Sequence, residues 1–361
     1  MMMTLTSDFR ERLSAGLTAC WKSPANIALI KYWGKKGHQI PANPSLSFSL
    51  NEAYTITRVS AKLNKEAKGP TVSFRFEGEE NKSFALKIEE FLKELKAHLD
   101  YLPWVELNIE SGNNFPHSAG IASSASAMSA LALSLICIEQ KIKNVELPEN
   151  EFRRKASFIA RLGSGSACRS IYGGYAIWGK HDDFPGSSNN FAIPIEFKPG
   201  KLFEGIRDTI LMVDPSPKKI SSRTGQMMMK EHPFAETRYK QASTNLTQMK
   251  KSLLENDWEL FSSITENEAL TLHAMMMTSL PGYMLMHPNT INIVQLLEQI
   301  RKQNHMKICY TMDAGPNVHL LYPEEEFGRI EPVLDELKKY CFNGMMINDK
   351  IGTGPENKHC K

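Results

Sequence analysis

The sequence carries little net charge of either sign. Its 43 lysines and arginines and 40 aspartates and glutamates leave a formal charge of +3 over 361 residues. Proteins that bind nucleic acid or charged membrane surfaces usually carry a clear basic excess. The balance therefore gives no reason to expect either partner, while a local basic pocket for a phosphorylated small molecule stays compatible with it.

Cysteine pairs and long apolar runs are also missing. The six cysteines form no CxxC pair and have no zinc-site spacing, so we predict no metal held by protein ligands alone. The first 16 residues lack the apolar segment of a signal peptide, and we expect no later run of membrane-spanning length. A reducing, cytoplasmic compartment without a membrane partner is the simplest expectation.

Two common phosphate-binding signatures are absent, namely a GxxxxGKS/T loop and the HRD and DFG set of protein kinases. In their place stands SGNNFPHSAGIASSASAMSA at 111–130, a polar loop that runs into a small-residue helix. Unpaired NH groups and the dipole make a helix N-terminus attractive to phosphate. On this stretch alone an ordinary Ser-capped helix is the simpler interpretation.

Apolar periodicity predicts a mixed α+β chain in two parts. Residues 180–202 are rich in Pro, Gly, Asn and Ser, so we place the boundary there and divide the chain into 1–202 and 203–361. The predicted strands are 18–32, 45–59, 71–76, 104–109, 175–178, 206–213, 307–311 and 318–322. The predicted helices are 87–98, one that follows the loop within 111–130 and ends near 143, 147–162, 289–304 and 324–340, with further long helices within 233–278.

Polar loops separate these apolar elements at 31–37, 113–126, 163–169 and 221–225. Arg169 stands one turn into a short helical stretch, where it opposes the helix dipole, so it is a candidate for binding a carboxylate or phosphate. A fifth loop, 313–317, brings Asp313, which a turn would also explain. Together the loops suit phosphoryl transfer, which needs backbone NH groups, cations and a carboxylate near the attacking hydroxyl.

The five loops together resemble the mevalonate diphosphate decarboxylase family of the GHMP kinase superfamily. PHSAGIASSAS resembles the superfamily phosphate loop, Pro-x-x-x-Gly-Leu-x-Ser-Ser. ANIALIKYWGK, RLGSGSACRSIYGG, KKISSRTG and MDAGPNVHLL occur in the order of the family and extend the match over nearly the whole chain.

This resemblance implies a two-domain α+β fold, with a ribosomal-protein-like N-terminal domain, a ferredoxin-like C-terminal domain and a deep cleft between them. It implies ATP-dependent decarboxylation of mevalonate 5-diphosphate to isopentenyl diphosphate, ADP, phosphate and carbon dioxide. The 3-hydroxyl is phosphorylated first, and loss of that phosphate leaves carbocation character at C3 as the carboxylate departs. It further implies ATP and Mg²⁺, the metal bridging ATP oxygens with few or no protein ligands, and a homodimer.

The resemblance also implies roles for individual residues. Asp313 matches the catalytic carboxylate near the 3-hydroxyl, Lys31 the lysine beside it, and Arg169 the arginine that holds the substrate. Asn26 matches an asparagine that orients this arginine and the substrate, and it is counted with these three among the catalytic residues. The remaining expected substrate contacts are Tyr32, Trp33, Gly34, Lys35, Ser164, Gly165, Ser166, Ala167, Cys168 and Arg223. The expected ATP contacts are Ser118, Gly120, Ser123, Ser124, Ser126 and Ser222, the last near the transferred phosphate.

The chain departs from the family pattern at several positions. His117-Ser118 replaces a usual Thr-Ala, Ile121 a Leu, Ala127 a Gly and Gln226 a Met. Its segment 73–78 only approximates the Arg-x-Trp-Leu-Asn-Gly stretch of some relatives. No motif therefore supports a contact between Arg75 and the diphosphate.

Three alternative functions follow from these departures and from the superfamily. A mevalonate 3-kinase would phosphorylate without decarboxylation, but the joint presence of Asp313, Lys31 and Arg169 argues against it. A decarboxylase acting on mevalonate 5-phosphate stays open. A non-catalytic GHMP-like sensor of small molecules would be expected to lose either the phosphate loop or the carboxylate, and this chain keeps both.

Overall fold

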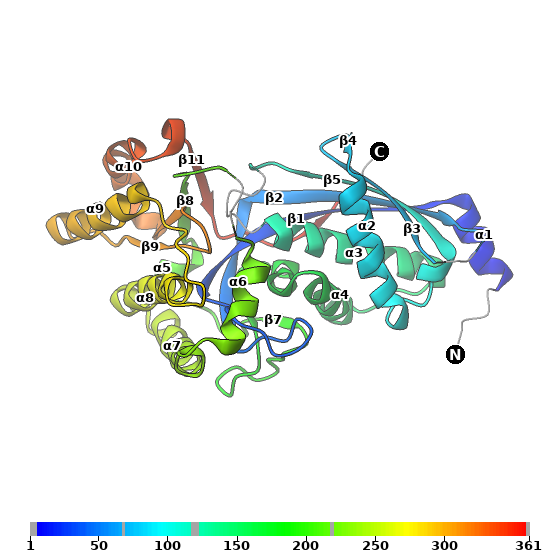
Figure 1. Ribbon diagram of the computed structural model, residues 1–361, viewed down its shortest axis with the longest axis horizontal. Helices are drawn as coiled ribbons and strands as arrows, with labels where there is room; N and C mark the ends of the chain where they lie inside the picture. The colour runs from blue at the N-terminus through cyan, green and yellow to red at the C-terminus, as the bar shows by residue number, and fades with distance from the viewer. Residues whose placement is uncertain (1–5, 67–68, 117–122, 217–219, 359–361) are drawn as a thin grey trace.

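The computed structural model describes residues 6–66, 69–116, 123–216 and 220–358. It places two β-sheets toward opposite ends of an elongated molecule (Figure 1). The larger sheet has the strand order β12-β1-β2-β5-β3-β4, with β6 on β2 and β7 on β6. Its pairings are antiparallel except between β3 and β5. The strands are β1 (Leu17–Ile30), β2 (Ser45–Leu63), β3 (Thr71–Phe76), β4 (Glu79–Glu80), β5 (Val105–Asn113), β6 (Tyr175–Trp178), β7 (Ala192–Pro194) and β12 (Glu356–Asn357).

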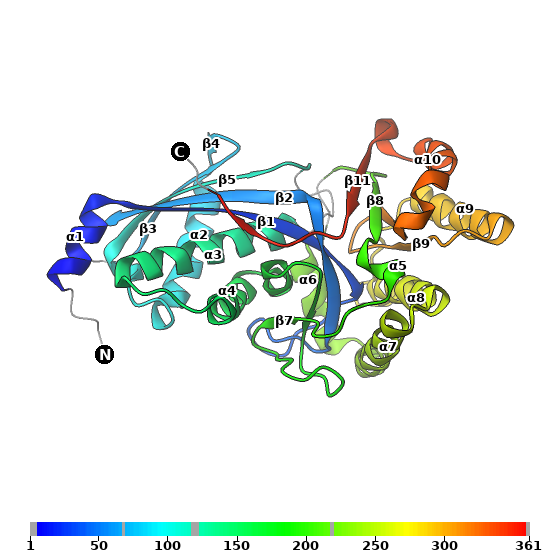
Figure 2. The same cartoon turned by 180° about the vertical axis from the view of Figure 1, so that it is seen from behind.

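Helices cover one face of this sheet (Figures 1 and 2). Buried and exposed residues alternate along β5, the pattern of a strand with one covered face. The final residues of β1 are instead buried without alternation, and β1 contacts helices from both halves of the chain. The helices of this part are α1 (Ser7–Ala15), α2 (Lys82–Glu94), α3 (Ser123–Lys143), α4 (Glu149–Gly163) and the short 3₁₀ helix η3 (Gly165–Ile171).

The smaller sheet is antiparallel, with the order β11-β8-β10-β9. One face packs on α9 and α10 in one apolar cluster. The other packs on α7 and α8 in a second cluster. Its strands are β8 (Arg207–Leu211), β9 (Cys309–Thr311), β10 (Val318–Tyr322) and β11 (Met346–Lys350). The helices are α5 (Lys201–Glu204), α6 (Ser222–Met228), α7 (Ala235–Glu255), α8 (Trp258–Met277), α9 (Pro288–Asn304) and α10 (Glu331–Lys338).

A shared core joins the two parts of the chain. The cluster around α7 and α8 also contains Ile27 and Leu29 of β1 and Leu46 and Phe48 of β2. In addition, β12 leaves the second part and pairs with β1 in the larger sheet. The C-terminal end of β1 therefore lies between the two halves, where residues that follow it can face groups from both.

The helix α3 corrects one expectation. It is 21 residues long and, within the described ranges, it is long and apolar enough by composition to cross a membrane, although we expected no run of that length. However, 72% of its most apolar stretch is buried inside the protein. Its small residues let it lie close to β1, where the Ser129 and Ser23 hydroxyls make a short contact. These are the surroundings of a core helix.

Candidate active site

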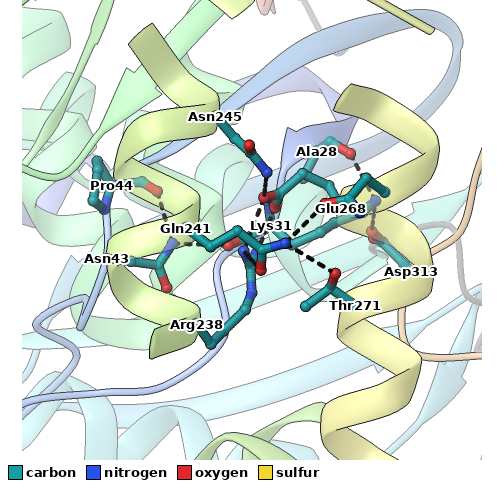
Figure 3. A network of polar contacts seen from close by, with 11 residues as sticks. Ala28, Lys31, Asn43, Pro44, Arg238, Gln241, Asn245, Glu268, Thr271 and Asp313 are labelled. Carbon is teal, nitrogen blue, oxygen red and sulfur yellow. Dashed lines mark hydrogen bonds and ion pairs between the residues drawn. The ribbon is translucent and has the colours of Figure 1, made fainter. Parts of the chain in front are cut away.

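An ion pair between Lys31 and Asp313 joins the two halves of the chain at the centre of the site. Lys31 directly follows β1 and is 1% exposed. Its Nζ donates to Asp313 Oδ1 at 3.0 Å and to the Ala28 carbonyl at 2.6 Å (Figure 3). Asp313 lies two residues after β9, and its side chain keeps 27% of its exposure. The pair therefore presents a partly open carboxylate beside a cation that solvent does not reach.

Burial lowers the pKa of Lys31, and the positive charge of Arg169 lowers it further. The carboxylates of Asp313 and Glu268 oppose this shift. Asp313 makes the larger opposing contribution, through both charge and its hydrogen bond. The protonation of Lys31 thus depends on two negative groups from the second half of the chain.

Arg169 is a buried cation whose hydrogen bonds run to neutral groups. It lies in η3 and is 3% exposed. Its guanidinium donates to Ser45 Oγ at 2.5 Å, to Ser47 Oγ at 2.8 Å and to Asn26 Oδ1 at 3.3 Å. Burial lowers the pKa of Arg169. A desolvated guanidinium with neutral hydrogen-bond partners is well suited to bind an anionic ligand.

Asn26 fixes the position of that guanidinium. Its Oδ1 accepts from Arg169, while its Nδ2 donates to Ser170 Oγ at 2.7 Å and to the Ser166 carbonyl at 3.3 Å. The amide thus ties β1 to η3. Its predicted orienting role agrees with this placement, and contact with substrate stays a prediction.

Lys35 and Arg223 are two further cations that lie close enough for their charges to interact. Lys35 donates to Gln39 Oε1 at 2.9 Å. Burial and then the nearby charge of Arg223 lower the pKa of Lys35. Arg223 itself lies on the exposed side of α6. Since the two charges repel, an anion bound between them would be stabilised by both.

Two glycines allow the segment that carries these groups to pack closely. Gly34 has φ of +111°, and a Cβ there would lie 2.3 Å from the Tyr239 hydroxyl. A Cβ at Gly225 would lie 2.3 Å from the Tyr283 hydroxyl and 2.7 Å from the indole of Trp33. The close approach explains why the sequence has glycine at both positions and holds α6 against the segment after Lys31.

The loop between α4 and η3 contributes backbone more than side chains. Ala167 and Cys168 are buried in the core of the first half, and burial raises the pKa of Cys168 to about 12. Any ligand contact at these two predicted residues would therefore come from the main chain. Gly165 packs against the ring of Tyr32, whose hydroxyl is buried with no hydrogen-bond partner within the described part of the chain.

The predicted ATP contacts divide into three groups. Ser118 and Gly120, together with the departures at 117 and 121, lie outside the described residues. Ser123 and Ser124 open α3, and the Ser124 hydroxyl is 3.4 Å from that of Ser164, so the two Ser-rich loops meet. Ser126 instead is fully buried, and its hydroxyl is engaged with Thr55 at 2.6 Å.

Ser222 is the first residue of α6 and is half-buried. The adjacent Ser221 caps the helix by accepting from the Thr224 amide. The hydroxyl of Ser222 is thus not needed for the cap. Its predicted contact with the transferred phosphate stays a prediction.

Sequence reasoning missed a cavity at the end of β5. It has a volume of about 440 Å³. It lies on the strand that leads, ten residues later, into α3. Its walls are Ile56, Arg58, Arg75, Gly78, Glu110, Ser111 and Gly112. The cations in this set look like ordinary exposed strand residues in the sequence, so periodicity gives no signal for them.

It also missed Glu268 and Arg238, although a signal for both was present. Arg238 falls on the buried stripe of α7 with Ala242 and Leu246. Glu268 falls on the stripe of α8 with Leu272. A charged residue in the apolar stripe of a helix is rarely buried unless it is paired.

The chain matches two family models over most of its length. Residues 23–191 match the "Diphosphomevalonate decarboxylase-like N-terminal domain". Residues 209–359 match the "Mevalonate 5-diphosphate decarboxylase C-terminal domain". The diphosphomevalonate decarboxylase of Debaryomyces hansenii is 32% identical over 332 residues, which cover 88% of this chain and 82% of that protein. The chain belongs to the diphosphomevalonate decarboxylase family.

Solved structures of this family share the fold. Mevalonate diphosphate decarboxylase from Staphylococcus aureus superposes with a TM-score of 0.80 at 29% identity, covering 95% of this chain and 98% of that one. A structure described as MDDEF in complex with MVAPP, AMPPCP and magnesium gives 0.80 at 28% identity, covering 95% and 99%. The predicted two-domain α+β fold of the GHMP kinase type and the predicted family are both confirmed.

Proposed function

We propose that the protein catalyses the ATP-dependent decarboxylation of mevalonate 5-diphosphate. The products are isopentenyl diphosphate, ADP, phosphate and carbon dioxide. One observation carries the proposal: Lys31 from the end of β1, Arg169 from η3 and Asp313 from the loop after β9 lie at a single site. The related structure with MVAPP, AMPPCP and magnesium supports the same ligand classes.

In this reaction Asp313 accepts the proton of the 3-hydroxyl as that oxygen attacks the γ-phosphorus of ATP. The ammonium of Lys31, 3.0 Å away, favours the ionised carboxylate before transfer. A tertiary hydroxyl is crowded and a weak nucleophile, so alignment by a fixed carboxylate is the main contribution of the protein at this stage.

Decarboxylation then needs the substrate carboxylate held near C3. The buried guanidinium of Arg169 offers paired donors for a carboxylate or phosphate oxygen, and Asn26 sets its orientation. As the C3–O bond to phosphate breaks, positive charge develops at C3. The electron pair of the bond to the carboxylate forms the new double bond, and carbon dioxide leaves.

The opposed cations Lys35 and Arg223 provide a place for the terminal phosphates of the substrate. Burial and then the charge of Arg223 lower the pKa of Lys35, and an anion between the two cations would relieve their mutual repulsion. A diphosphate fits this arrangement because it brings more negative charge than a monophosphate. The 5-phosphate decarboxylase is the second candidate, since both substrates would use the same cations.

We place the nucleoside of ATP in the cavity lined by Arg58, Arg75 and Ser111. It lies on the strand that leads to the α3 N-terminus, where the phosphates are expected. For Mg²⁺, no cluster of three metal-ligating side chains occurs within the described ranges. Mg²⁺ would be held mainly by the ATP oxygens, with few or no protein ligands, and would neutralise phosphate charge there.

The assay that tests the proposal compares three acceptors with ATP and Mg²⁺: mevalonate, its 5-phosphate and its 5-diphosphate. ADP and carbon dioxide are measured together. We expect equal amounts of both with the 5-diphosphate. ADP without carbon dioxide would identify a kinase, carbon dioxide mainly from the 5-phosphate would identify the second candidate, and no turnover would favour a sensor.

We also propose a cytoplasmic homodimer, supported by the family resemblance alone. Among the described residues, Cys137, Cys168, Cys309 and Cys341 are free thiols, as expected in a reducing compartment. The disulfide at Cys20 is unusual for such a compartment and counts against this part of the proposal. Light scattering on the purified protein measures the oligomeric state, and fractionation of cells that express the chain tests the compartment. A monomeric mass or recovery outside the cytoplasm would contradict the respective part of this proposal.

A further inference from the structure

One helix touches both members of the central ion pair. Glu268 Oε2 of α8 accepts from the backbone N–H of Lys31 at 2.8 Å. Five residues along the same helix, His273 Nε2 lies 3.1 Å from the carbonyl oxygen of Asp313 and donates to it. These residues are separated by about 7.5 Å along the helix axis at 1.5 Å per residue. The helix α8 thus connects the backbone of Lys31 with that of Asp313.

Glu268 is itself held in place from α7. Its carboxylate is fully buried and pairs with the Arg238 guanidinium through both oxygens, one at 2.8 Å. Asn245 Nδ2 donates to the same carboxylate at 2.7 Å (Figure 3). With the amide of Lys31 this makes four donors to one carboxylate, so its position has little freedom.

The backbone of Lys31 is held from the other side as well. Asn43 Nδ2 donates to the Lys31 carbonyl at 2.9 Å and to the Pro44 carbonyl at 2.7 Å (Figure 3). Lys31 lies just past the last residue of β1, where the ladder no longer pairs its main chain. Side chains from two other segments replace that pairing and fix both peptide groups of the residue.

A second, half-buried acid on α8 shows that this contact is not a general feature of the helix. Glu266 pairs with Arg301 at 2.6 Å and accepts from the Tyr310 amide at 3.3 Å. It therefore joins α8 to α9 and β9. The two glutamates make similar ion pairs from one helix but reach different targets.

We propose that Glu268 and His273 are positioning residues, through which α8 sets the separation between the Lys31 ammonium and the Asp313 carboxylate. Neither needs to touch substrate. The helix holds the lysine of the first half and the aspartate of the second at working distance before any ligand enters. The inference rests on the proposed function, because it assigns these two residues to the decarboxylation site.

A consequence for charge follows from the groups that surround Lys31. Asp313 and Glu268 supply negative charge, Arg169 supplies positive charge, and Arg238 stands behind Glu268. Because the carboxylate of Glu268 raises the pKa of Lys31, its removal lowers that pKa further. Since activity requires protonated Lys31, the loss of activity with rising pH then begins at a lower pH than in wild type.

The test compares Glu268→Gln with Glu266→Gln in steady-state kinetics. We expect kcat to fall about 100-fold in Glu268→Gln, the loss typical of a misplacement near 1 Å. Both KM values should stay within about threefold of wild type. In Glu266→Gln, kcat should stay within about threefold. Equal kcat losses in the two variants, or a loss confined to KM, would overturn the proposal.

The alkaline limb of the kcat–pH profile should also move to lower pH in Glu268→Gln and stay in place in Glu266→Gln. A purely structural role of Glu268 would not move it. NMR titration of ¹³C-labelled lysine gives the same answer without turnover: the pKa of Lys31 should fall only in Glu268→Gln. An unchanged pKa of Lys31 would refute this inference, whether or not the wild type is active. Inactivity of the wild type on every substrate would instead refute the proposed function.

The other end of the helix provides an independent test if Glu268→Gln does not fold. His273→Gln keeps a donor near the position of Nε2, whereas His273→Leu removes it. We expect His273→Gln to retain kcat within about fivefold and His273→Leu to lose at least about 30-fold, with KM values preserved. Equal activity of these two variants would contradict the positioning role.

Discussion

Replacing Asp313 with asparagine removes the carboxylate charge at the centre of the site while keeping the size of the side chain. The Lys31 and Asp313 side chains are 2% and 27% exposed. Breaking a fully buried pair costs roughly 3–5 kcal/mol and an exposed pair at most about 1 kcal/mol. This pair lies between those limits, so we expect the free energy of unfolding to fall by roughly 2 kcal/mol near neutral pH.

The pH dependence of that loss follows from Lys31. Burial holds the pKa of Lys31 below its ordinary 10.5, and Asp313 is the largest influence that raises it. Without Asp313 the pKa of Lys31 falls further. Between that lowered pKa and 10.5 the unfolded chain binds more protons than the folded one, so stability rises with pH across this window. In Asp313→Asn the rise should begin at a lower pH than in wild type.

Turnover is the second readout for Asp313→Asn. A positioned general base contributes roughly 10²–10⁴-fold, so we expect kcat to fall by about 10³-fold. ATP binding, measured by titration calorimetry, should change less than about threefold, because the proposed phosphate and nucleoside contacts lie elsewhere. Asp257→Asn is the matched control, since it changes the helix cap of α8 to another good capping residue. A kcat of Asp313→Asn within fivefold of wild type would refute the assignment of Asp313.

Three further changes test other parts of the site. Arg169→Ala should raise KM for the substrate and lower kcat, each by at least about tenfold, because charged hydrogen bonds contribute about 1.5–3 kcal/mol; an effect no larger than that of Ser47→Ala would contradict its role. Gly34→Ala should lower stability by about 1–3 kcal/mol in denaturant unfolding, because of its positive φ and the nearby Tyr239 hydroxyl; a stability equal to wild type would contradict the close packing. Arg75→Ala should raise KM for ATP about tenfold and leave KM for the substrate unchanged; the reverse pattern would move the nucleoside elsewhere.

Much of the fold could be predicted from the sequence, because the information is local. Alternating polarity marks β2 and β5, and the small, apolar run after 123 marks α3. The loops that carry Lys31, Arg169 and Asp313 could be chosen because their motifs resemble one family. Periodicity alone would not have chosen them, since each also fits an ordinary turn or solvated charge.

The remaining features depend on packing between distant segments. Lys31 and Asp313 are 282 residues apart, and only the shared core around α8 brings them together. Ser126 resembles its neighbour Ser124 in sequence, but the helix rotates it into the core against Thr55. The place of Glu268 in the apolar stripe of α8 signals that it is paired, but only the packing of α7 identifies Arg238 as its partner. In each case the partner is set by tertiary structure, which local patterns do not encode.

The central claim is that one site phosphorylates the 3-hydroxyl and releases the carboxylate. Its most direct test is a single reaction with ATP, Mg²⁺ and mevalonate 5-diphosphate labelled at the carboxyl carbon. We predict one labelled carbon dioxide and one isopentenyl diphosphate for each ADP formed. ADP that accumulates while the label stays in the substrate would contradict the account.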